Sequence, residues 1–185
     1  MDRDRLPITL QQPHVHLTKR AVWALFGETV KLTPKSPTDM PGKFVAAQTV
    51  TVTGPNGASV ALPITGPSSP YTQVELTVDL AGRLGVDAKI EPSGKGTAGG
   101  VTVSGPEGSL TLDKGVLIPQ PHFHLPPEDA STLSLLEGQT VTLATPDGRI
   151  LEKVLVRVNH LTANRIHLLA EPDCPFTPDD VFHVV

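Results

Sequence analysis

Two His-x-His pairs are the residues of this chain whose types and spacing are best suited to chemistry. His14 and His16 form the first pair, and His122 and His124 form the second. In a β-strand, residues i and i+2 point to the same face, so each pair presents two imidazoles side by side. Imidazole is a common ligand of zinc. The pairs therefore predict two metal ions, or one site shared between two similar halves.

Each pair needs a further donor, because a catalytic zinc site has three protein ligands and one open position. Two candidates lie on predicted strands, Glu75 and His167. A glutamate among strand-forming residues usually faces solvent, and a histidine on an apolar strand is usually a core residue, so these alternatives stay open. His160 and His183 are predicted to be surface or terminal residues, and Cys174 a small structural residue in a loop.

The elements that must position these residues are short strands and turns. Among 185 residues there are 16 glycines and 19 prolines, and aromatic residues make up 4%. Between the turns the residues alternate as strands do, which predicts an all-β fold with short helices, built as small barrels or sandwiches. Segments 31–43 and 91–99 are expected to be loops. The predicted hairpins pair 49–53 with 58–62, 101–103 with 109–112, and 140–143 with 150–158; further strands are predicted at 6–10 and 165–169, and short helices at 21–26, 78–84 and from 126.

Charge and hydropathy exclude several classes of protein. The net charge of −4 carries no basic footprint for nucleic acid. No apolar run reaches the length that spans a membrane. Cys174 is the single cysteine, so no intrachain disulfide can form, and an intracellular protein is the simplest interpretation.

The order of short motifs along the chain resembles a known family. It runs His-x-His-Leu, Gly-Pro, Thr-Gln-Val-Glu, Gly-Pro-x-Gly, Gly-Val-Leu-Ile, His-x-His, Pro-Glu-Asp-Ala, Val-Arg-Val and Ile-His, over residues 13–171. This series resembles the PduL-type phosphotransacylases, the phosphate propanoyltransferases of bacterial microcompartments.

The resemblance implies two small β-barrels capped by short helices, one from 13–119 and the other from 1–12 plus 120–185. It also implies an active site with two zinc ions between the barrels. One zinc would be bound by His14, His16 and Glu75, and the other by His122, His124 and His167. The implied reaction moves a short-chain acyl group between coenzyme A and inorganic phosphate.

Three positions depart from the family pattern. Pro13 and Pro121 stand where the family has the arginine of Arg-His-x-His, and Ser69 stands where it has another arginine. Arginine is the preferred residue for phosphate, because its planar guanidinium can donate two parallel hydrogen bonds to it. Arg165 shares a strand face with His167, so we hypothesise that Arg165 contacts phosphate instead; the alternative is a surface arginine. A zinc-binding paralogue with lost or altered chemistry, and a scaffold protein that merely retains the histidines, are the competing functional hypotheses.

Location and assembly are predicted from more general features. Family members destined for microcompartments often carry an amphipathic N-terminal extension, whereas about a dozen residues precede the first His pair here and Pro7 limits helix formation. The expectation is therefore a cytoplasmic protein, with the microcompartment lumen as the alternative. A homodimer is the default expectation for assembly.

Overall fold

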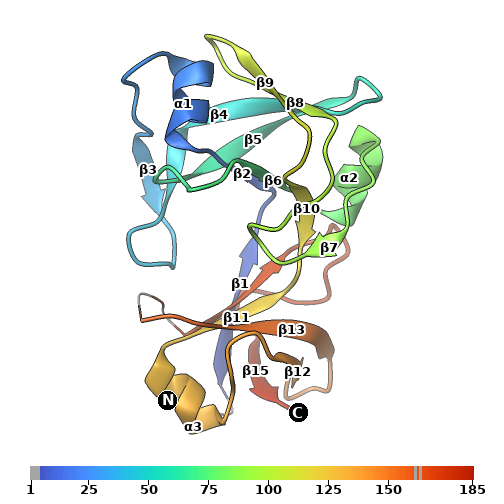
Figure 1. Cartoon of the computed structure of the whole chain (residues 1–185). Coiled ribbons are helices and arrows are strands. Elements are labelled where there is room, and N and C mark those ends of the chain that lie inside the picture. The colour runs from blue at the N-terminus through green and yellow to red at the C-terminus, as the bar shows by residue number, and fades with distance from the viewer. Residues whose placement is uncertain (1–4, 161, 163) are drawn as a thin grey trace. The chain divides into compact units, whose positions relative to one another are not determined.

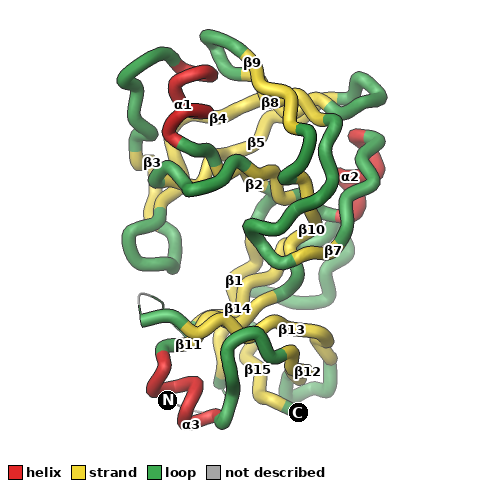
Figure 2. Tube along the Cα trace, viewed as in Figure 1, coloured by secondary structure: helices red, strands yellow, loops and turns green. Residues whose placement is uncertain are grey.

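The structure is a computed structural model that describes residues 5–160, 162 and 164–185. Within these residues it consists mainly of strands with three short helices, which confirms the predicted fold class (Figure 1, Figure 2). The chain divides into two compact units. Unit 1 comprises Met1–Gln12, Asp39–Pro41 and Gln120–Val185, and unit 2 comprises Pro13–Thr38 and Gly42–Pro119.

Unit 1 is built on a closed barrel with the strand order β1-β14-β11-β13-β12-β15, and β15 pairs with β1 to complete the circle. Buried apolar side chains fill it, among them Phe123, Ile166 and Phe182. Its elements are β1 (Leu6–Gln11), β11 (His122–Leu125), α3 (Pro127–Leu133), β12 (Thr140–Ala144), β13 (Ile150–Val158), β14 (Arg165–Leu169) and β15 (Val181–Val184).

Unit 2 is built on a curled, nine-stranded sheet in the order β7-β10-β6-β2-β5-β4-β8-β9, with β3 paired to β4 beside this path. Its core is aliphatic, with Val15, Ile64 and Val74 fully buried. Its elements are β2 (His14–His16), α1 (Lys19–Phe26), β3 (Pro34–Pro37), β4 (Phe44–Thr53), β5 (Ser59–Gly66), β6 (Gln73–Glu75), α2 (Val78–Leu84), β7 (Ile90–Glu91), β8 (Val101–Ser104), β9 (Ser109–Leu112) and β10 (Val116–Pro119).

The short helices begin where the local chemistry favours a helix start. Thr18 caps α1 by accepting a hydrogen bond from the backbone N–H of Ala21 at 3.1 Å. Thr77 caps α2 in the same way. α3 instead has Pro127 at its first position, where a missing N–H costs nothing. Each helix therefore starts within a few residues of the strand that precedes it.

The two Gly-Pro-x-Gly hairpin turns pack against the ends of helices. A Cβ atom on Gly54 would lie 1.9 Å from the carbonyl oxygen of Leu84, which ends α2, so only glycine fits there. In the second turn, the N–H of Glu107 donates to the carbonyl of Leu25, near the end of α1, at 3.0 Å. These turns thus satisfy or cover carbonyl groups that the helix ends leave without an intrahelical partner.

One predicted loop contains a strand. The segment 31–43 was expected to be a loop because of its prolines, yet β3 forms within it and pairs with β4. All four residues of β3 are exposed. A proline is tolerated on such an edge, because its missing N–H would face solvent there. The prediction of a loop is therefore wrong for Pro34–Pro37.

In the part of the chain that the structure describes, none of the helices has the length and apolar character needed to cross a membrane.

Candidate functional site

The first His pair meets Glu75 on the neighbouring strand. β2 and β6 are antiparallel partners, and their register places His14 directly opposite Glu75. The Nε2 atom of His14 lies 3.3 Å from Oε2 of Glu75 and 3.1 Å from Nε2 of His16. Nε2 of His16 lies 3.9 Å from Oε1 of Glu75. Three donor atoms therefore converge on one point of unit 2.

Glu75 is held in place by polar side chains that the sequence did not single out. Its Oε1 atom accepts hydrogen bonds from Nε2 of Gln73 at 2.5 Å and from Oγ of Ser93 at 2.7 Å. The Oε1 atom of Gln73 accepts in turn from the N–H of Gly94 at 2.7 Å. Glu75 is only 2% exposed, so the solvent-facing alternative is wrong. These bonds fix the carboxylate so that Oε2 faces His14.

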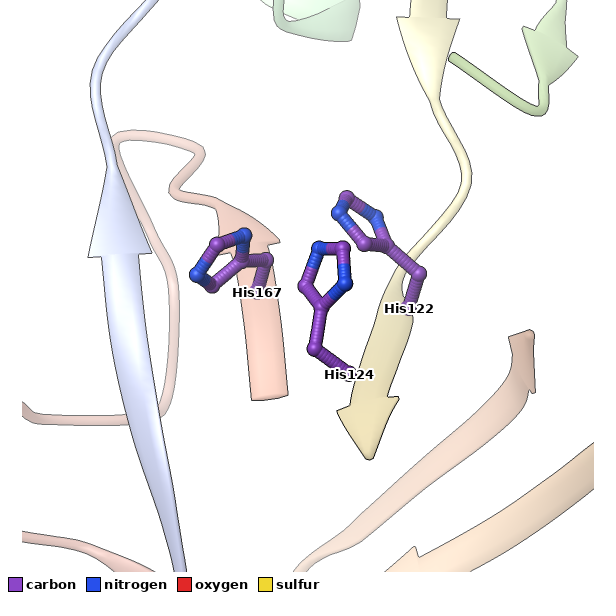
Figure 3. Close-up of side chains that lie close together, drawn as sticks. All are labelled: His122, His124 and His167. Atoms are coloured by element: carbon purple, nitrogen blue, oxygen red, sulfur yellow. The ribbon is translucent and has the colours of Figure 1, made fainter. Parts of the chain in front are cut away.

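The second His pair meets His167 in unit 1. β11 and β14 are antiparallel partners, with His122 directly opposite His167. The ring of His167 lies 5.2 Å from that of His122 and 4.8 Å from that of His124, measured between centroids. Figure 3 shows one nitrogen of each ring turned toward a shared centre. Nδ1 of His122 lies 3.0 Å from the carbonyl oxygen of Gln120 and donates to it, which leaves Nε2 for the centre.

The two clusters are built on the same strand pattern. In both, the His-x-His strand has an antiparallel partner on one side, β6 or β14, that carries the third donor. In both it has a parallel partner on the other side, β5 or β13. The strand carrying the third donor pairs in parallel with a strand beyond it, β10 or β1. Glu75 and His167 therefore occupy equivalent positions in two equivalent sheets.

Two of the imidazoles are held in their neutral form. Burial is the main cause that lowers the pKa of His16 to about 3, and the neighbouring His14 and Lys43 lower the pKa further. Burial also lowers the pKa of His124 to about 3, with help from the adjacent imidazoles of His122 and His167. Neutral imidazole is the form that binds metal ions, so neither ring has to lose a proton at neutral pH.

The donors fit a zinc ion in number, type and spacing. Each cluster offers three ligand atoms that lie within 4.8 Å of one another. Bonds of about 2.0–2.1 Å in a tetrahedron place two ligand atoms about 3.3 Å apart. The distances from His14 to His16 and from His14 to Glu75, 3.1 and 3.3 Å, already lie close to that value. Little rearrangement is needed for the first cluster to hold the ion.

Arg165 and Asp39 lie beside the second cluster. Arg165 is opposite His124 in the register, and its Nε atom lies 3.7 Å from Oδ2 of Asp39. Oδ2 of Asp39 also lies 2.9 Å from Nε2 of His167 and accepts from Thr9 at 2.5 Å. Burial alone would raise the pKa of Asp39, but the hydrogen bonds from His167 and Thr9 outweigh it and lower the pKa to about 2. Sequence reasoning missed Asp39, which is 128 positions from His167 and follows no periodic pattern.

The remaining candidates lie outside both clusters. His160 is exposed, and His183 is on β15 and half-buried. Cys174 is a half-buried residue that packs against the apolar core of unit 1. At the positions where family arginines were expected, Ser69 is buried and its N–H donates to the carbonyl of Leu17 at 2.8 Å. The carbonyl of Pro121 accepts from Leu155, also at 2.8 Å.

The fold and the two clusters define an all-β protein with two three-donor centres suited to metal ions. A family model described as phosphate propanoyltransferase matches residues 7–174 of this chain. The chain is 35% identical to the phosphate propanoyltransferase of Rhodobacter capsulatus, over 90% of this chain and 79% of the relative. It is 37% identical to that of Thermotoga maritima, over 84% and 76% respectively, and 38% identical to that of Leptotrichia buccalis, over 84% and 75%. The chain therefore belongs to the phosphate propanoyltransferase family, a family of acyltransferase enzymes.

Proposed function

We propose that this protein transfers a short-chain acyl group between coenzyme A and inorganic phosphate, with one zinc ion held by each cluster. The observation that carries the proposal is the pair of equivalent three-donor clusters, each with the donor set of a catalytic zinc site. Family membership supports phosphate acyltransfer, and the donor chemistry supports the metal.

The reaction exchanges one bond to the acyl carbon for another. In the direction of acyl phosphate, a phosphate oxygen attacks the thioester carbonyl, the C–O bond forms, and the C–S bond breaks to release the coenzyme A thiolate. When bound, zinc would supply a Lewis acid for carbonyl or phosphate oxygens and a partner for sulfur. No group on the enzyme has to be acylated for the atoms to balance.

The chain's own residues prepare the two centres. Gln73 and Ser93 bind Oε1 of Glu75 and hold the carboxylate in one orientation. The other oxygen, Oε2, therefore already faces His14. Burial keeps His16 and His124 neutral, so their lone pairs are available. Each cluster supplies three protein ligands, so a bound ion would leave a coordination position for a substrate atom.

Arg165 is the residue that we propose contacts phosphate. It lies on the strand face of His167, opposite His124, and a third of its side chain is exposed. A hydrogen bond to a charged group is worth about 1.5–3 kcal/mol, so Arg165→Ala is expected to raise the Michaelis constant for phosphate by roughly tenfold or more. Steady-state kinetics with varied phosphate test this, with Arg20→Ala on the exposed face of α1 as the control. An unchanged Michaelis constant for phosphate contradicts the role.

A zinc-binding protein with altered chemistry is the second candidate function. The observation in its favour is that Pro13, Ser69 and Pro121 stand where the family resemblance implies arginine, so three expected guanidinium groups are missing. Such a protein would bind the same metal but release coenzyme A without using phosphate.

A chelation and reconstitution experiment separates these functions. The purified protein is expected to contain about two zinc ions per chain and to form propanoyl phosphate from propanoyl-coenzyme A and phosphate. Removing the metal should abolish turnover, and adding zinc should restore it, because Lewis-acid stabilisation supplies several kcal/mol of the catalysis. Release of coenzyme A at the same rate without phosphate would favour the altered chemistry. Protein purified without bound zinc and unable to take it up would refute both.

A further inference from the structure

The carboxylate of Asp39 contacts the side of His167 that faces away from the cluster. Figure 3 shows one ring nitrogen of His167 turned toward His122 and His124, and the other turned away from them, toward the neighbouring strand. The Nε2 atom lies 2.9 Å from Oδ2 of Asp39. A carboxylate that bound the same ion as the three imidazoles would point toward their shared centre. Among the described residues, the donors that converge there belong to His122, His124 and His167, and Asp39 is not one of them.

The hydrogen bonds of His167 assign its tautomer. The amide nitrogen of Gln11 lies 3.3 Å from Nδ1 of His167, and an amide nitrogen can only donate. Nδ1 therefore carries a lone pair. The proton of the neutral ring is then on Nε2, from which it is donated to Asp39. The two contacts agree on one tautomer, in which the lone pair that can bind a metal ion is on Nδ1, and a bound ion would take the place of the Gln11 hydrogen bond there.

Asp39 is itself fixed by its neighbours. Oδ2 accepts a second hydrogen bond from the hydroxyl of Thr9 at 2.5 Å, and the guanidinium of Arg165 lies 3.7 Å away. The side chain is 19% exposed, and that of His167 is 3% exposed. A carboxylate held this firmly can hold the ring that it contacts, both in rotation and in tautomer.

We propose that Asp39 is a positioning residue for the second metal centre: by accepting the Nε2 proton of His167, it directs the Nδ1 lone pair at the ion. A carboxylate behind a metal-bound histidine also makes the imidazole a stronger ligand. The proposal rests on the proposed function, because it takes the three-histidine cluster to be a zinc site. It assigns to the turn between β3 and β4 a function at a cluster formed by β11 and β14.

Metal affinity provides the first test. Zinc and cobalt(II) binding are measured by chelator competition on the metal-free full chain, as wild type, Asp39→Ala and Asp39→Asn. Removing such an outer partner typically costs 10–100-fold in affinity, so Asp39→Ala should weaken one of two sites by about that factor and leave the other unchanged. Asp39→Asn keeps an acceptor oxygen, so its zinc affinity should lie between those of the wild type and Asp39→Ala. The control is Asp179→Ala, which removes the same charge from an exposed position of unit 1.

The outcomes separate this proposal from the proposed function. Two zinc sites of wild-type affinity in Asp39→Ala would overturn the role of Asp39 and leave the zinc enzyme standing. A wild-type chain that binds no zinc would overturn both. A lower melting temperature in Asp39→Ala with unchanged affinities would mean that the contact is only structural, which also overturns the proposal.

Nitrogen NMR of the imidazoles gives a second, independent readout. In the metal-free wild type, long-range correlations should report the proton of His167 on Nε2, and zinc should then shift Nδ1. In Asp39→Ala the metal-free ring should show a mixture of tautomers, and in Asp39→Asn the wild-type tautomer should be recovered. A zinc-induced shift at Nε2 of the wild type would overturn the assignment.

Discussion

Replacing His122 by alanine is expected to leave one zinc ion per chain in place of two and to lower the rate of acyl transfer by on the order of 10³-fold. The second cluster has three donors, so the variant retains two, too few for a stable tetrahedral site. Loss of Lewis-acid stabilisation costs several kcal/mol, and each 1.36 kcal/mol is tenfold in rate. Zinc content is measured by elemental analysis beside the propanoyl-coenzyme A assay.

The same loss is expected from the first cluster. Glu75→Gln keeps the shape of the side chain but replaces the carboxylate, whose Oε2 faces His14, by a neutral amide, so it should also reduce the zinc content to about one. The two variants should affect different ions because each cluster is assembled from the strands of its own unit. Finding the same single site lost in both would contradict the assignment of separate donor sets.

His160→Ala is the matched control. It removes an imidazole from an exposed position outside both clusters, so zinc content and rate should stay at wild-type values. Full zinc content in His122→Ala would refute the assignment of this ligand. No stoichiometric zinc in the wild type, and no change in His122→Ala, would favour a scaffold protein in which the histidines have no ligand role. Circular dichroism of each variant establishes that the barrel has formed, so a loss of zinc is not mistaken for a loss of fold.

Patterns of short range were readable from the sequence. The two-residue spacing of His14 and His16 predicts a common face because strand geometry has that period, and both rings do turn to one point. Thr18 followed by an apolar segment predicts a capped helix because the hydroxyl can reach the first free N–H groups. Such signals depend on neighbours within a few residues, so they survive without knowledge of tertiary structure.

Features that depend on distant residues were not readable in this way. By its sequence Glu75 is predicted to be a solvent-facing strand residue. Its burial depends on the hydrogen bond from Ser93, which forms only when the turn carrying Ser93 packs beside β6. Asp39 carries no signal at all, since its contact with His167 spans 128 positions. Burial of charged groups is set by such long-range contacts, and a single sequence does not encode them as a pattern.

The equivalence of the two clusters is stronger in structure than in sequence. The donor is a glutamate on β6, in Gln-Val-Glu, and a histidine on β14, in Arg-Ile-His. Both donors nevertheless lie opposite the first histidine of their pair. The strands on either side also match in direction. Register therefore preserves the donor geometry even where the donor changes from carboxylate to imidazole, which agrees with an origin by duplication.

Phe123→Ala is expected to lower the free energy of unfolding by about 3–5 kcal/mol, the range for removing a large aromatic side chain from a core. Phe123 lies between the two histidines of β11, and strand alternation turns it to the opposite face, where it is fully buried. It packs with the apolar residues that fill the barrel, including Ile166 and Phe182. Urea unfolding of the metal-free protein measures the change, because bound zinc would add its own stabilisation.

Phe123→Leu is the control for this prediction. It keeps most of the apolar volume and should cost under about 1.5 kcal/mol, and a loss as large as that of the alanine variant would point to a specific need for the aromatic ring. A cost below about 1 kcal/mol for Phe123→Ala would contradict its place in the core. The proposed function has zinc bind the folded barrel, so adding zinc should stabilise both variants, and the alanine variant should need more zinc to reach the same stability. The alternation that turns His122 and His124 toward the donor cluster thus also turns Phe123 into the core, so one strand couples the placement of the donors to folding.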